Sequence, residues 1–155
     1  MAPSEGRKAP DFTLAWTGPG DLDLAALAGS KAVLFFYPKD DTSGCTREAL
    51  DFDALLPQFA AADTRVVGIS VDDLASHARF RKKHGLSVDL ASDPDKRVVE
   101  AYGVWTEKSM YGRKYMGTER TTLLLDRDGR VARIWPKVKV PGHAQEVLAA
   151  AQALT

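Results

Sequence analysis

Hydrophobic positions along the chain alternate between strand-like and helix-like patterns. A continuous apolar run at 32–37 is typical of a strand buried on both faces of a sheet, and the largely apolar segment 66–71 predicts a second buried strand. Between them, apolar residues recur three and four positions apart from Phe52 to Phe59, which predicts one helix over 45–61. The other predicted elements are strands over 9–16, 88–91, 121–125 and 131–135, and helices over 24–27, 74–84, 93–102 and 142–154.

The order of these elements indicates the fold class. Strands and helices alternate through most of the chain, and Asp128-Gly129 then joins two strands in a hairpin before a closing helix. We therefore predict an α/β fold, with a mixed, mostly parallel central sheet covered by helices on both faces. Because no linker divides the sequence, we expect residues 1–155 to form a single domain.

Composition and charge narrow the function classes. The chain has 155 residues, 45% of them hydrophobic, and its 21 Lys and Arg balance 21 Asp and Glu. That balance argues against a nucleic-acid footprint and against a polybasic membrane patch. No apolar run reaches the roughly 18 residues of a membrane helix, and no apolar signal segment follows the first residues, so we expect a cytoplasmic protein.

Cys45 is the sole cysteine, so it cannot form an intramolecular disulfide, and the three histidines show no metal-ligand spacing. It follows a polar loop and falls in the first turn of a predicted helix. There, unpaired N–H groups and the helix dipole favour a thiolate. Gly44 allows close backbone approach, and Thr42 places a hydroxyl three residues before the sulfur. A lone cysteine is otherwise usually a small buried apolar side chain.

The surrounding motif resembles a known family. The string Pro38-x-x-x-Thr42-x-x-Cys45 is similar to the active-site signature of the peroxiredoxins, and residues 36–46 resemble the peroxiredoxin Q subfamily, also called bacterioferritin comigratory protein. The resemblance implies a thioredoxin-like fold and a thiol-dependent peroxidase that needs no cofactor. Further similarity extends over 9–14, 108–112, 119–129 and 138–143.

The resemblance also implies roles for individual residues. Cys45 would attack the O–O bond of a hydroperoxide and become a sulfenic acid. Thr42 would hydrogen-bond the peroxide, and the N–H groups of Gly44 and Cys45 are further candidate donors. Pro38 would shape the pocket and shield the sulfur from water.

Two charged residues complete the implied site. Arg120, from a distant strand, would supply fixed positive charge that favours the Cys45 thiolate and polarises the peroxide. Glu48, about one turn after Cys45, could orient Arg120. Without such proximity, both would be ordinary surface charges.

The sequence departs from the subfamily pattern at two positions. Ser43 stands where proline is frequent, and Leu50 stands where many members carry a resolving cysteine. Since no second cysteine exists, we expect an enzyme of the one-cysteine type. Its reductant would be an external thiol, namely a thioredoxin-like protein, glutathione or another small thiol. We expect a monomer or a weak homodimer.

Some alternatives stay open at this point. The same thiolate could serve a redox-sensing module with little turnover, whereas a disulfide reductase is disfavoured because there is no Cys-x-x-Cys pair. The segment 105–117 could border the active site or form an interaction surface. The adjacent Asp40 and Asp41 lack further spaced ligands, so we expect them in a solvated loop.

Overall fold

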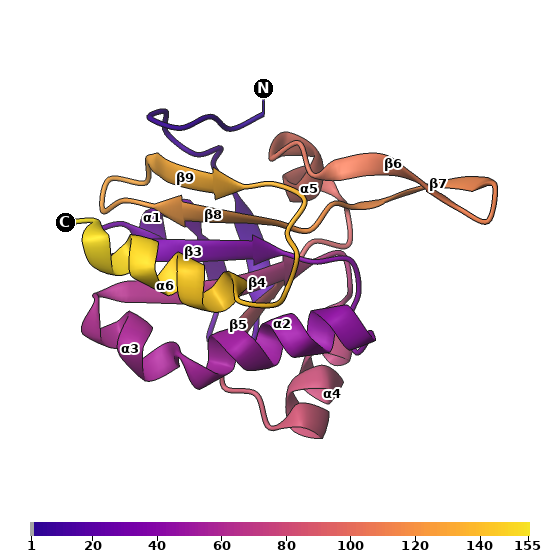
Figure 1. The fold of residues 1–155 in the computed structure, drawn as a ribbon, viewed down its shortest axis with the longest axis horizontal. Coiled ribbons are helices and arrows are strands. Elements are labelled where there is room, and N and C mark those ends of the chain that lie inside the picture. Colours follow the sequence, from indigo (N-terminus) through magenta and orange to yellow (C-terminus); the bar gives the residue numbers. More distant parts are fainter. Residues whose placement is uncertain (1) are drawn as a thin grey trace.

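A computed structural model describes residues 2–155 and contains a mixed sheet between two layers of helices (Figure 1). The strands are β1 (Thr13–Trp16), β2 (Asp21–Asp23), β3 (Lys31–Phe36), β4 (Thr64–Ser70), β5 (Asp89–Ser92), β6 (Trp105–Met110), β7 (Arg113–Thr118), β8 (Thr121–Leu125) and β9 (Val131–Trp135). The helices are α1 (Leu24–Leu27), α2 (Ser43–Ala54), α3 (Leu56–Ala61), α4 (Leu74–His84), α5 (Arg97–Ala101) and α6 (His143–Ala153). The predicted α/β class is confirmed.

The strand order across the main sheet is β2-β1-β5-β4-β3-β8-β9. The parallel pairs, β3 with β4 and β4 with β5, lie at its centre, and the flanking pairs within the described residues are antiparallel. Strand β3 is buried along its whole length, as its continuous apolar run predicts. Its last residue, Phe36, pairs with Ile69 on β4 and with Thr121 on β8. This register brings the start of β8 next to the loop that follows β3.

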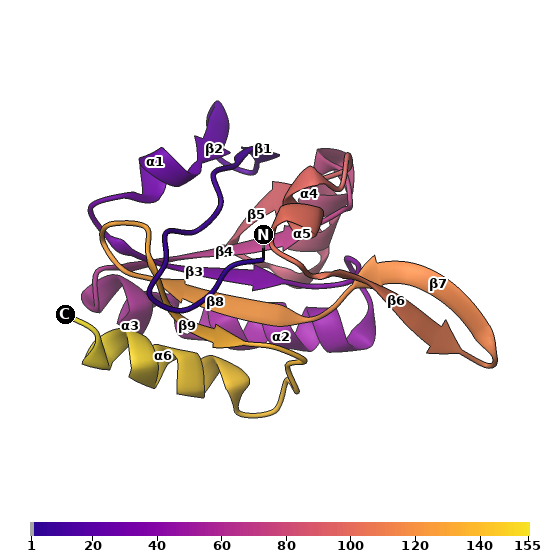
Figure 2. The same cartoon turned by 90° about the horizontal axis from the view of Figure 1, so that it is seen from above.

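The sheet separates two apolar clusters. On one face, Val33 and Phe35 of β3 pack with side chains from α2, α3, α4 and α6. On the other face, Leu34 and Phe36 pack with side chains from α1 and α5. Figure 2 shows these two layers from the side of the sheet, with α2 and α6 adjacent on one face. The alternation of β3 side chains therefore produces the predicted covering of both faces.

The helix predicted over 45–61 is wrong in one respect, because the structure divides it. Helix α2 begins at Ser43 and ends at Ala54, and α3 begins at Leu56. Pro57 explains the break, since it lacks an N–H group and its ring would clash with the Asp53 carbonyl in a continuous helix. At the start of a new helix the same proline is well tolerated.

Strands β6 and β7 form a separate antiparallel hairpin that extends away from the sheet (Figure 1). The sequence pattern did not predict these strands. Most of their residues are exposed, so the segment lacks the apolar alternation that marks a strand packed on a core. No helix within residues 2–155 combines the length and apolar character needed to cross a membrane.

Candidate active site

Cys45 is the third residue of α2 and lies just beyond the end of β3. Its side chain is 2% exposed, and the thiol is free. Helix α2 begins where the Thr42 carbonyl accepts the Thr46 N–H at 2.8 Å. The sulfur therefore lies within the first turn, where backbone N–H groups lack helical partners and the dipole is positive. The predicted position of Cys45 at a strand-to-helix junction is confirmed.

Arg120 reaches Cys45 from the position that directly precedes β8. The pairing of β8 with β3 places it near the start of α2. Its Nη2 atom donates to Cys45 Sγ at 3.4 Å, and its Nη1 atom donates to Glu48 Oε1 at 2.8 Å. Because Cys45 and Glu48 are three residues apart on α2, they face the same direction and share one guanidinium. The structure thus brings together the three residues that the resemblance linked.

Glu48 is an unusual partner because it is almost fully buried, at 1% exposure. Its Oε1 atom receives the Arg120 hydrogen bond, whereas Oε2 has no hydrogen-bond partner within the described chain. Burial raises the pKa of Glu48 to about 7, although the Arg120 cation opposes that rise. Burial also disfavours the charge on Arg120, but Glu48 and Cys45 outweigh it and raise the pKa of Arg120. The guanidinium is therefore cationic, and the carboxyl group titrates near neutral pH.

Gly44 gives the guanidinium room to approach. A methyl group at this position would lie 3.1 Å from Arg120 Nη2, closer than an ordinary contact. The missing side chain thus permits the Arg120–Cys45 hydrogen bond. Pro38 is half-buried, and a single residue separates it from the end of β3. It ends the run of buried strand residues before the active-site loop turns toward α2.

Thr42 is the residue before α2, but its side chain does not cap the helix. Its hydroxyl instead donates to the Lys39 carbonyl at 2.9 Å. A hydroxyl has one hydrogen and two acceptor lone pairs, so lone pairs remain for a second partner. Thr42 is exposed and can meet a molecule arriving from solvent.

The expectation that Asp40 and Asp41 both lie in a solvated loop is wrong for Asp40. This carboxylate is buried and accepts hydrogen bonds from Tyr37 Oη at 2.6 Å and Ser76 Oγ at 2.8 Å. His77 Nδ1 lies 2.7 Å from its second oxygen. Burial alone would raise the pKa of Asp40, but these bonds and the His77 charge lower it below its ordinary value.

This buried network fixes the active-site loop to α4. Asp41, which is exposed as expected, adds an ion pair to Lys83 and a hydrogen bond with His84 Nε2, both at 2.7 Å. The sequence does not predict this network, because its side chains come from elements far apart in the chain. The one available hint was an acidic residue, Asp40, three positions after the buried strand predicted over 32–37. Among residues 2–155, no group of three or more His, Cys, Asp or Glu side chains is arranged to hold a metal ion.

Lys108 of β6 is a further residue near the site that the sequence did not single out. It is half-buried, and burial together with the Arg120 cation lowers its pKa, while Cys45 and Glu119 oppose that change. Lys108 is therefore close enough to feel the charges of the site. A lysine in a mostly polar segment carries no sequence signal of a functional residue, so Lys108 could not be predicted.

Comparisons with known proteins match nearly the whole chain. Residues 6–134 match the AhpC/TSA family. A putative peroxiredoxin bcp from Coxiella burnetii is 47% identical over 148 residues, covering 96% of this chain and 98% of that protein. A Bacillus subtilis peroxiredoxin Bcp is 42% identical over 143 residues, covering 92% and 91%.

Solved structures extend the similarity to three dimensions. The Xylella fastidiosa PrxQ structure, a cysteine-to-serine mutant, superposes with a TM-score of 0.92 at 37% identity, covering 99% of this chain and 98% of that one. Xanthomonas campestris bacterioferritin comigratory protein gives a TM-score of 0.89 at 44% identity, covering 97% and 98%. The family match and these relatives show that the chain belongs to the AhpC/TSA family, among the thiol-dependent peroxidases known as peroxiredoxins of the Bcp or PrxQ type.

Proposed function

We propose that this peroxidase reduces hydrogen peroxide and small organic hydroperoxides through Cys45 and is regenerated by an external thiol. The observation that carries the proposal is the guanidinium of Arg120, which donates to Cys45 Sγ and is held by buried Glu48. A cation fixed beside the sulfur favours the thiolate and stays in place as charge moves onto the peroxide. The Xanthomonas relative is described with alkyl peroxide reduction activity, which supports the substrate class.

The reaction balances without a cofactor. The Cys45 thiolate forms an S–O bond to one peroxide oxygen, the O–O bond breaks, and the departing oxygen takes a proton to leave as water or an alcohol. An external thiol then attacks the sulfenic acid, releasing water and forming a mixed disulfide. A second thiol completes the reduction and restores Cys45.

Three neighbouring residues would position the peroxide. The Thr42 hydroxyl already donates to Lys39, so it would accept a hydrogen bond from the O–H of the peroxide. The N–H groups of Gly44 and Cys45, in the first turn of α2, would donate to its oxygens. Pro38 would restrict water at the edge of the site.

Reduction of the Cys45 sulfenic acid by a thiol requires more access to the sulfur than its oxidation by a small peroxide. Cys45 is 2% exposed, which suits a small peroxide better than a protein thiol. The exposed position 50 on α2 carries leucine, and no second cysteine exists within the chain. We therefore expect the first turn of α2 to open after oxidation, so that an external thiol can reach the sulfenic acid.

Steady-state peroxide consumption with dithiothreitol tests the proposal. The wild-type chain should turn over many equivalents, and Cys45→Ser should turn over none. Thr42→Val should slow peroxide attack, whereas the matched Thr42→Ser, which keeps the hydroxyl, should retain most of the rate. Consumption of a single equivalent would instead favour the redox-sensing module, and activity in Cys45→Ser would contradict the proposal.

A further inference from the structure

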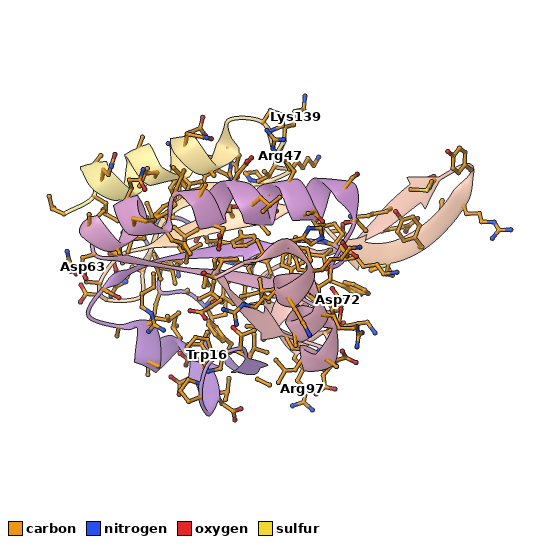
Figure 3. All side chains as sticks on the ribbon, turned by 90° about the horizontal axis from the view of Figure 1, so that it is seen from below. Trp16, Arg47, Asp63, Asp72, Arg97 and Lys139 are labelled. Atoms are coloured by element: carbon orange, nitrogen blue, oxygen red, sulfur yellow. The ribbon has the colours of Figure 1, made fainter. Side chains whose placement is uncertain are left out.

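The β6–β7 hairpin exposes an unusual share of large apolar side chains. Four of the six that the described chain exposes belong to it, namely Met110, Tyr111, Tyr115 and Met116. Tyr111, in the turn, is 98% exposed. Figure 3 shows the side chains toward the hairpin tip standing clear of the rest of the molecule. Exposed apolar groups gathered on one projecting element are typical of an interaction surface.

The strand register assigns these side chains to two faces. Lys108 pairs with Tyr115, and Met110 pairs with Arg113, so all four share one face, here called the cationic hairpin face. The opposite face carries Trp105, Glu107, Ser109, Lys114 and Met116.

The cationic hairpin face is the one continuous with the active site. A methyl group built on Gly117 would lie 3.2 Å from Lys108 Cδ and 3.5 Å from Tyr115 Cε2, which confirms that these side chains share a side. Strand β7 ends at Thr118, two residues before Arg120, whose guanidinium contacts Cys45 Sγ, so the base of the hairpin leads directly into the active site. The charges of Arg120 and Cys45 also act on Lys108. Trp105, on the opposite face, instead lies against the Lys96 ammonium. A partner seated on the cationic hairpin face would therefore lie beside the strand that leads to Arg120, close to the charges of the active site.

Charge narrows the identity of that partner. Within the described hairpin, the cationic face has Lys108 and Arg113 and no carboxylate, since Glu107 is on the other face, 3.6 Å from Lys114. In a twofold dimer through this face, the patch would meet its own copy and oppose cation to cation. An acidic partner would instead be attracted and oriented.

The length of the hairpin further restricts the kind of partner. A strand of six residues spans roughly 20 Å, so a molecule that touches both the Tyr111 turn and the surroundings of Cys45 is a macromolecule and not a small thiol. Apolar Met110 and Tyr115 between the charges provide the contact area that a protein partner needs.

We propose that the cationic hairpin face docks an acidic protein thiol, which reduces the oxidised Cys45. This inference rests on the proposed function, since it names the reductant of the same sulfur. The thiolate of the partner attacks the Cys45 sulfenic acid, releasing water and forming an intermolecular disulfide. A second thiol of the partner then displaces Cys45, leaving the partner oxidised.

A matched pair of charge reversals tests the docking face. Arg113→Glu alters the cationic hairpin face, and Lys114→Glu makes the same change one residue along, on the opposite face. The probe is a recombinant bacterial thioredoxin of acidic isoelectric point, kept reduced by its reductase, with dithiothreitol as a small uncharged comparison. Arg113→Glu should raise the KM for thioredoxin about fivefold or more. Lys114→Glu should change it less than about twofold, and neither should alter turnover with dithiothreitol.

The apolar residues provide a second matched pair. Tyr115→Ser should raise the thioredoxin KM, and Met116→Ser should leave it close to wild type. Equal effects of the paired variants would overturn the proposal, as would turnover with dithiothreitol but none with thioredoxin. A wild-type dimer that Tyr115→Ser converts to monomer would also overturn it, because a second copy would then occupy the face. Absence of turnover with either thiol would instead contradict the proposed peroxidase function itself.

Discussion

Replacing Glu48 by glutamine keeps the shape of a buried side chain and removes its charge. Because burial raises the pKa of Glu48 from 4.5 to about 7, the folded chain binds this proton more tightly than the unfolded chain does. The free energy of unfolding therefore falls as pH rises from about 4.5 to about 7, where the folded carboxyl group loses its proton.

The size of this effect follows from the difference in pKa. That difference is about 2.5, and one pKa unit corresponds to about 1.4 kcal/mol, so the wild-type chain should lose about 3 kcal/mol across this window. Glutamine cannot ionise and resembles the protonated acid. At pH 5 the two proteins should therefore be similarly stable, and at pH 8 Glu48→Gln should be the more stable by about 3 kcal/mol.

Urea unfolding of both proteins at pH 5 and pH 8 measures the difference. Glu107→Gln is the matched control, because Glu107 is exposed and only 3.6 Å from Lys114, as in an ordinary surface pair. It should change the pH dependence by less than about 1 kcal/mol. If wild type and Glu48→Gln show the same pH dependence, Glu48 is ionised throughout, and the reasoning from its burial is refuted.

Two further substitutions probe how the site is held. Gly44→Ala should displace the Arg120 guanidinium by a few tenths of an ångström and slow peroxide attack about tenfold, with circular dichroism unchanged; an unaffected rate would show that the close approach is unimportant. His77→Leu should destabilise the fold by about 3 kcal/mol, since it removes the His77 contact of the buried Asp40 carboxylate and leaves only the neutral donors Tyr37 and Ser76. His84→Leu removes the contact to exposed Asp41 and keeps an apolar side chain against Phe80, so it should cost less than about 1 kcal/mol in the same denaturation experiment. Similar losses in the two variants would contradict the importance of burial.

The pattern of hydrophobic and polar residues predicted helices and strands well where buried positions recur at the regular spacing of a helix or a strand. The β8–β9 hairpin and α4 have the predicted bounds, because an apolar strand pair around Asp128-Gly129 and a glycine after His84 mark their limits. Gly85 adopts the left-handed conformation expected of a helix stop, with φ of +64°. The β6–β7 hairpin escaped prediction because its side chains face solvent on both sides, so no core imposes a pattern on it.

The candidate site was predictable only in part from the residues themselves. The placement of Cys45 in a first helical turn follows from local sequence, but the approach of Arg120 depends on β8 pairing with β3, and only the family resemblance indicated it. The Asp40–His77 contact joins residues 37 apart in the chain. Short-range patterns hold no information about such pairs, because tertiary packing creates them.

Rapid oxidation of Cys45 tests the central claim most directly. Wild-type protein and Arg120→Gln are each mixed with one equivalent of hydrogen peroxide, quenched at successive times with a sulfenic-acid trap, and analysed by mass spectrometry. Trapped sulfenic acid should appear on Cys45, about a hundredfold more slowly in Arg120→Gln than in wild type. Equal rates in the two proteins, or oxidation away from Cys45, would contradict the claim that the Arg120 guanidinium prepares this sulfur for peroxide.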